Sequence, residues 1–181
     1  MKGKFYKAGL ASLLLFVLSG AMPTFALNPA TRDYLTPKEE EQVKEAQALD
    51  KRIEVLIKVA GRRLLLLTDQ NAVSSKQVQK DLEKWGELPE GTRAELMMDI
   101  ANILDAAINY IDDVALRDEK NALLPKALRK LSDAATRFQT QLAPMREQTK
   151  EDQERAAIEQ VMEKAQEILE AANKLPAPEK K

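Results

Sequence analysis

Carboxylates recur along residues 92–116, and they are the side chains in this sequence that come closest to a chemical site. Carboxylate-bridged metal sites in helical bundles combine inward-facing glutamates with Glu-x-x-His pairs. The chain has no histidine, and the acids lie beside an apolar stripe at helical spacing, which favours a solvated helix face. We therefore predict neither a metal site nor a cofactor. The acids concerned are Glu95, Asp99, Asp105, Asp112 and Asp113.

The common catalytic arrangements of side chains are also disfavoured. The absence of histidine removes the usual general base, and the absence of cysteine removes thiolate nucleophiles, thiolate metal sites and disulfides. Ser132 has no histidine partner, and Lys130, two residues before it, would point to a different helix face. The six glycines form no phosphate-binding loop. The sequence therefore predicts a protein that is not an enzyme.

The N-terminus carries the pattern of an export signal. Lys2, Lys4 and Lys7 form a basic region at its start. The apolar stretch Leu10–Leu18 follows, and residues 19–26 are mostly small or helix-breaking. This order is typical of a secretory signal peptide, so we predict that residues 1–26 are removed. Cleavage after residue 21 is the second choice.

An uncleaved membrane anchor is the alternative interpretation. The apolar span of residues 8–22 has fifteen residues and ends at Pro23, whereas a spanning helix needs about 20. We therefore predict an exported protein, periplasmic or extracellular, that meets the membrane only transiently through its signal segment. Removing residues 1–26 takes away three lysines and no acids, which leaves 25 basic and 29 acidic residues. This mildly acidic chain lacks the basic footprint of nucleic-acid binding.

The rest of the chain is organised around Ile53–Leu67, where ten of fifteen residues are apolar. On a helix, Glu54, Lys58 and Arg62 form one narrow polar line and leave most of the circumference apolar. A capping box at residues 36–39 predicts that this helix begins at residue 36 and runs to about residue 68. Gly61 costs about 1 kcal/mol relative to alanine in a helix, which indicates a close helix crossing.

The segments that follow predict four further helices. Capping motifs open a short helix at residues 74–77 and a long one at residues 92–95, which runs to about residue 116. The next helix starts between residues 121 and 125 and contains Pro144, which should kink or end it. The polar run 146–155 predicts a hairpin turn before a last helix over 157–175, with one long kinked helix as the alternative. We predict that residues 27–35 form an extended lead-in and that residues 176–181 form a disordered tail.

These patterns predict an all-α fold. No β-branched run alternates at period two, and only 4% of residues are aromatic. Four long helices of similar length can align side by side. We therefore predict an antiparallel four-helix bundle in a single domain, residues 36–175, after the signal peptide. One short extra helix would lie in the first connection.

Two functions fit such a bundle. In the first, it is a structural or protein-interaction module of the cell envelope, and its partner is another envelope protein. In the second, it carries a lipid or another apolar ligand between its helices. A solvent-exposed apolar patch of more than several hundred Å² would favour the partner, and an enclosed apolar cavity of about 300 Å³ or more would favour the ligand. The residues expected at this surface or mouth are Val55, Val59, Leu65, Leu66, Trp85, Met97 and Met98.

Overall fold

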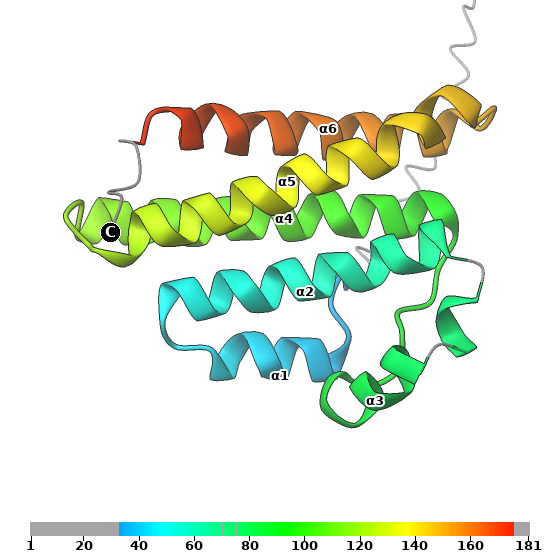
Figure 1. Ribbon diagram of the computed structural model, residues 1–181, viewed down its shortest axis with the longest axis horizontal. Coiled ribbons are helices and arrows are strands. Elements are labelled where there is room, and N and C mark those ends of the chain that lie inside the picture. The colour runs from blue at the N-terminus through cyan, green and yellow to red at the C-terminus, as the bar shows by residue number, and fades with distance from the viewer. Residues whose placement is uncertain (1–32, 70, 75, 176–181) are drawn as a thin grey trace, which may run out of the picture. The chain divides into compact units, whose positions relative to one another are not determined.

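The computed structural model describes residues 33–69, 71–74 and 76–175, and these residues form helices and no strand (Figure 1). The all-α prediction is confirmed. The predicted signal peptide, the tail 176–181 and residues 27–32 of the lead-in lie outside the described residues. The helices are α1 (Pro37–Glu45), α2 (Leu49–Thr68), α3 (Lys76–Trp85), α4 (Arg93–Arg117), α5 (Leu123–Gln148) and α6 (Asp152–Asn173), with a 3-10 turn, η1 (Ala72–Ser74), before α3.

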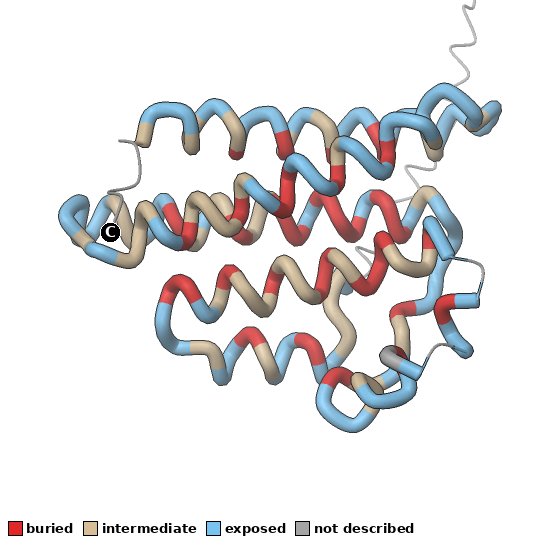
Figure 2. Tube along the Cα trace, viewed as in Figure 1, coloured by how far each residue is buried: buried red, intermediate tan, exposed pale blue. Residues whose placement is uncertain are grey.

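The four long helices bury one shared core. Helix α2 packs against α4 and α5, and α6 packs against the same two helices from the other side. The sides that face inward are buried along α2, α4 and α5 (Figure 2). Ile53, Ile100, Phe138 and Val161 contribute one fully enclosed side chain from each long helix. Burial of these apolar faces provides most of the driving force for the fold.

Helices α2 and α5 run parallel. Lys126 of α5 pairs with Asp50 of α2 at 2.6 Å, and one turn further along both helices Lys130 pairs with Glu54. The residue numbers rise together on the two helices, so the pairs fix both direction and register. We call these two ion pairs the α2–α5 seam.

Helices α4 and α6 also run parallel. Arg93 lies 3.3 Å from Glu154, and further along both helices Lys164 lies 2.7 Å from Asp105. By contrast, α2 and α4 are antiparallel, because Arg93 at the start of α4 bonds to the carbonyl of Leu67 near the end of α2. The expected antiparallel packing thus holds for α2–α4 and α5–α6 but not for α2–α5 or α4–α6. The connection from α4 to α5 joins two helices that are not close neighbours.

The predicted first helix is wrong in one respect, because it divides into α1 and α2. Thr36 forms the expected capping box with Glu39. The chain then leaves the helix at residues 46–48 and turns back, so that α1 packs beside α2 (Figure 1). The apolar spacing runs through this break, and the turn brings Glu39 of α1 into a buried ion pair with Arg63 of α2. Tyr34 and Leu35 of the expected lead-in also pack against the core.

The later helix boundaries follow the sequence more closely. Thr92 forms its predicted capping box with Glu95 and opens α4. Pro144 does not end its helix, because α5 continues to Gln148. Both Pro144 and Thr140, whose carbonyl loses its donor, are exposed, so water can satisfy that carbonyl. A turn at residues 149–151 lies within the predicted hairpin, although α6 starts five residues earlier than expected.

Candidate functional site

Four charged side chains are buried between α1, α2 and α4. Arg63 is 1% exposed, and its Nη1 donates to Oε1 of Glu39 at 2.7 Å. Its Nη2 donates to the carbonyl of Tyr34 at 2.6 Å, and its Nε lies 3.7 Å from Oδ2 of Asp99. Arg62, the fourth member, has its Nε 3.3 Å from Glu39. We call Glu39, Arg62, Arg63 and Asp99 the buried charge cluster.

Arg62 joins α2 to the end of α3. Its guanidinium donates to three successive carbonyls, at 2.7 Å to Trp85, 2.8 Å to Gly86 and 2.6 Å to Glu87. The last carbonyls of a helix have no partner within it and carry the negative end of its dipole, so a guanidinium is well suited to them. Burial lowers the pKa of Arg62. Gly86 adopts the left-handed conformation, with φ of 68°, that ends α3.

The buried charge cluster is suited to holding segments together and not to acid–base chemistry. Its two acids face two guanidinium groups that are themselves enclosed. Because the cluster is enclosed on all sides, these carboxylates have no route to a substrate. Asp99 was expected on a solvated helix face, and this expectation is wrong because Asp99 is 4% exposed beside Arg63. Arg62, expected on a polar line, is likewise buried.

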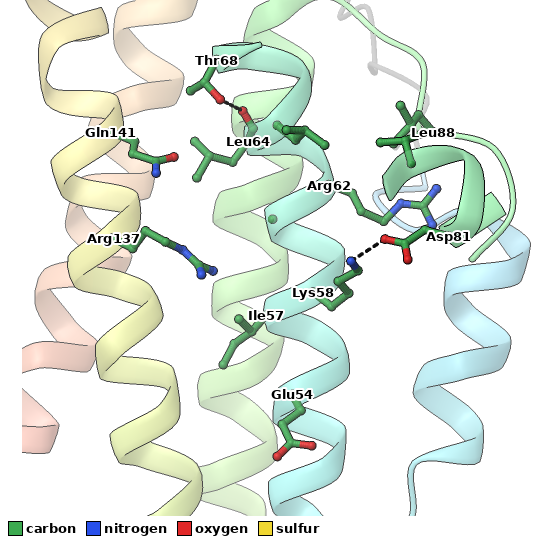
Figure 3. A pocket seen from close by; sticks show the side chains of 13 residues that line it. Glu54, Ile57, Lys58, Arg62, Leu64, Thr68, Asp81, Leu88, Arg137 and Gln141 are labelled. Carbon is green, nitrogen blue, oxygen red and sulfur yellow. Dashed lines mark hydrogen bonds and ion pairs between the residues drawn. The ribbon is translucent and has the colours of Figure 1, made fainter. Parts of the chain in front are cut away.

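A half-open cleft of about 470 Å³ lies on another side of α2, between α2, α3 and α5 (Figure 3). Ile57, Leu64 and Leu65 of α2, together with Val78 and Leu88, supply its apolar surface. We call it the α2–α5 cleft. Its lining residues are Glu54, Ile57, Lys58, Gly61, Arg62, Leu64, Leu65, Thr68, Val78, Asp81, Leu88, Arg137 and Gln141.

Polar groups border this apolar surface on both sides. Lys58 of α2 pairs with Asp81 of α3 at 2.5 Å. On the opposite wall, Arg137 and Gln141 of α5 point toward α2 (Figure 3). The Arg137 guanidinium carbon lies 5.4 Å from the ring centre of its neighbour Phe138. Within the described residues no carboxylate lies within ion-pair distance of Arg137.

Gly61 lies in the wall of the cleft and faces open space. A Cβ atom built at this position would meet no heavy atom within 4 Å outside its own helix. The prediction of a close helix crossing at Gly61 is therefore wrong. A glycine inside a helix lowers stability, and no neighbour within the described part of the chain requires it here. The cleft is deepened by this missing side chain.

The predicted surface residues do not form one patch. Leu65 lines the α2–α5 cleft, and Leu66 lines an adjoining hollow of about 320 Å³ that shares Val78 and Leu88 with the cleft. Val55 is half-buried against the core, whereas Val59 and Met97 are completely enclosed. Trp85 is 8% exposed and Met98 is 39% exposed. Of the seven predicted surface residues, Leu65 lies in the α2–α5 cleft and Leu66 in the hollow beside it.

Several residues that line the cleft are not predicted from the sequence. They include Ile57, Gly61, Arg137 and Gln141. A glycine is costly within a helix, so Gly61 did signal an unusual position. From the sequence alone, that position indicates a close helix crossing and not part of a cleft. Arg137 and Gln141 carried no such signal, because their place opposite α2 depends on the parallel register of α2 and α5. That register is not readable from the periodicity of either helix alone.

The residues that the structure describes offer neither a cluster of metal ligands nor a membrane-spanning helix. No group of three or more acidic side chains there is arranged to hold a metal ion. None of the described helices is both long enough and apolar enough to cross a membrane. In comparisons with known proteins, no protein-family model, curated protein or solved structure matches this chain.

Proposed function

We propose that this protein is an exported four-helix-bundle module of the cell envelope that binds another protein through the α2–α5 cleft. The observation that carries the proposal is the cleft itself, an apolar surface bordered by Lys58, Asp81 and Arg137. Interfaces combine an apolar centre with polar groups at the rim in this way. The absence of histidine and cysteine from the chain supports a non-catalytic role.

The shape of the cleft favours a protein over a small apolar ligand. A pocket for a small molecule encloses most of its ligand, typically about 70–90% of the ligand surface. The α2–α5 cleft is half-open and continues past Val78 and Leu88 into the second hollow. Val73, which lines that hollow, is 62% exposed. The volume of about 470 Å³ keeps an apolar ligand as the second candidate.

The export part of the proposal rests on the basic and apolar order of residues 1–26. Expression of the full chain should yield a mature protein whose N-terminus is residue 27, in the envelope or the medium. Mass spectrometry of that species measures the cleavage site. An N-terminus that remains at Met1 would show that the segment is not a cleaved signal.

Photo-crosslinking in intact cells tests the binding proposal. A photoreactive phenylalanine replaces Gln141, which is exposed and points into the cleft, and in a control strain it replaces Gln160, which is exposed on α6. The expected result is a discrete protein adduct at position 141 that is absent at position 160. Adducts with lipid alone at position 141 would favour the ligand-carrier function. Identical adduct patterns at both positions would contradict a role for the cleft.

A further inference from the structure

The α2–α5 seam ends where the α2–α5 cleft begins. Both ion pairs of the seam join residues at one sequence offset, because the two helices run parallel in a single register. The next cation along α5 is Arg137. The α2 residue that precedes Arg137 by the same number of positions as Glu54 precedes Lys130 is Gly61. An acid stands opposite each lysine of the seam, but no side chain stands opposite Arg137. The cleft is therefore suited to a carboxylate that comes from outside this chain.

The end of helix α4 carries exposed side chains of matching chemistry. Leu116 is 86% exposed, the highest value among the large hydrophobic side chains of the described residues. Asp112 lies one turn before it on the same face, and Glu119 follows it. These residues and Ala115 surround one shallow hollow. We call Asp112, Ala115, Leu116 and Glu119 the α4 knob, since a leucine beside acids complements an apolar cleft with an arginine on its wall.

Within one chain the α4 knob is far from the cleft. Helices α2 and α4 are antiparallel, so the end of α4 lies beside the start of α2, where Arg52 stacks over the ring of Tyr110 at 4.8 Å. The cleft runs along α2 from Glu54 to Thr68, on the side that faces α3 and α5. The α4 knob of one chain therefore reaches a cleft only on another copy.

We propose that copies of this chain associate head to tail, with the α4 knob of one copy in the α2–α5 cleft of the next. Leu116 rests on the apolar surface over Gly61, and the carboxylate of Asp112 pairs with Arg137. Helical anchors spaced by four residues commonly dock into grooves in this manner. The two surfaces differ, so the contact is heterologous and extends into open chains unless its rotation closes a ring. The inference rests on the proposed function and names a second copy as the partner.

Two single-site variants test the association. Gly61→Leu fills the cleft where a Cβ meets open space, and Leu116→Asp removes the apolar tip of an exposed residue, so neither should lower the melting temperature. Sedimentation velocity is run on the protein as it accumulates when the full sequence is expressed. Ala156→Leu, at an exposed position on α6, is the control for adding a leucine.

The expected results are specific to a head-to-tail contact. The mass of the wild type and of Ala156→Leu should rise with concentration, whereas each of the other two variants alone should remain monomeric. An equimolar mixture of Gly61→Leu and Leu116→Asp should form pairs and nothing longer, since it retains one intact cleft and one intact knob. A wild type that is monomeric at every concentration, or a mixture that does not pair, would overturn the proposal.

The crosslinking experiment separates this inference from the proposed function. An adduct of two copies at position 141 that disappears in Leu116→Asp supports self-association. An adduct with a different protein that persists in Leu116→Asp retains the interaction module and overturns the second copy as the partner. The absence of any protein adduct at position 141 overturns both.

Discussion

Three consecutive residues of α2 separate two regions of opposite character. Arg63 enters the buried charge cluster, Gly61 lines the open α2–α5 cleft, and Arg62 lies between them and bonds to the end of α3. The cluster is closed by α1, α3 and α4, whereas the cleft remains half-open beside α5. The comparison shows that one helix can hold the fold together on one face and present a binding surface on another.

The two regions also respond differently to substitution. An enclosed ion pair loses several kcal/mol when one partner is removed, because the other charge remains buried without compensation. Residues beside a half-open cleft can change without leaving a cavity or an enclosed charge. The loss of stability on substitution therefore distinguishes an enclosed region from an open one.

The largest effect is expected in the buried charge cluster. Arg63→Met leaves Glu39 and Asp99 enclosed without their shared guanidinium, so the free energy of unfolding should fall by about 3–5 kcal/mol. Chemical denaturation followed by circular dichroism measures this change. Lys51→Met, on the exposed face of the same helix, is the control and should change the stability little.

A double variant sharpens this prediction. Glu39→Met combined with Arg63→Met removes both charges of the closest pair, which lie 2.7 Å apart. Its loss of stability should be smaller than the sum of the two single losses. Additive losses would indicate that the two side chains do not act as a pair.

The next largest effect is expected at Trp85, the only tryptophan in the chain. Its ring is 8% exposed and belongs to the core, so Trp85→Ala should destabilise the protein by about 3 kcal/mol. Thermal melts of the variant and the parent decide the point. A melt identical to that of the parent would show that α3 does not cover the core through this side chain.

A smaller effect is expected when the pH is lowered. A hydrogen bond from Lys126 lowers the pKa of Asp50, and hydrogen bonds from Lys130 and Lys51 lower the pKa of Glu54. A carboxyl group whose pKa is lower in the folded state adds stability above its unfolded pKa, and this stability is lost as the pH falls through the folded pKa.

The α2–α5 seam should therefore weaken as the pH falls below the ordinary values of 4.5 for Glu54 and 3.8 for Asp50. The effect is smaller than those above because the lysines of the seam are partly solvated. Thermal melts at neutral pH and at about pH 3.5 measure it. The double variant Lys126→Gln and Lys130→Gln should lose less stability over this range, and an unchanged pH dependence would contradict the assignment.

The smallest of these effects is expected on the wall of the cleft. Leu65→Asp places a carboxylate beside water, so the unfolding free energy should change by less than about 1 kcal/mol. The matched control is Val59→Asp, six residues earlier on the same helix, which places a charge at a completely enclosed position and should destabilise the protein by several kcal/mol. Similar melts for the two variants would remove the distinction between the closed and open faces.

Local signals in the sequence predicted the local structure well. The capping boxes at Thr36 and Thr92 form as expected, because each depends on side chains only three residues apart. The all-α fold and most core positions follow from apolar spacing within each helix. Interactions between residues that are only a few positions apart can be predicted from a short stretch of sequence.

The rest depends on distant partners. The break at residues 46–48 interrupts no apolar spacing, and it is stabilised by the contact of Glu39 with Arg63, which lies 24 residues away. The parallel pairing of α2 with α5 likewise depends on which helices become neighbours. For this reason the cleft opposite Arg137 could not be predicted from the sequence, and the expected binding role of Leu65, which lines the cleft, stays a prediction.

The unfolding free energy of Gly61→Leu, measured beside that of Arg63→Leu, tests most directly whether α2 has one closed and one open face. We predict that Gly61→Leu is as stable as the parent or more stable by about 1 kcal/mol, because the helix gains a better helix-forming residue and the side chain enters open space. Arg63→Leu should lose about 3–5 kcal/mol. A loss at Gly61 as large as that at Arg63 would show that both faces are closed and would contradict the account.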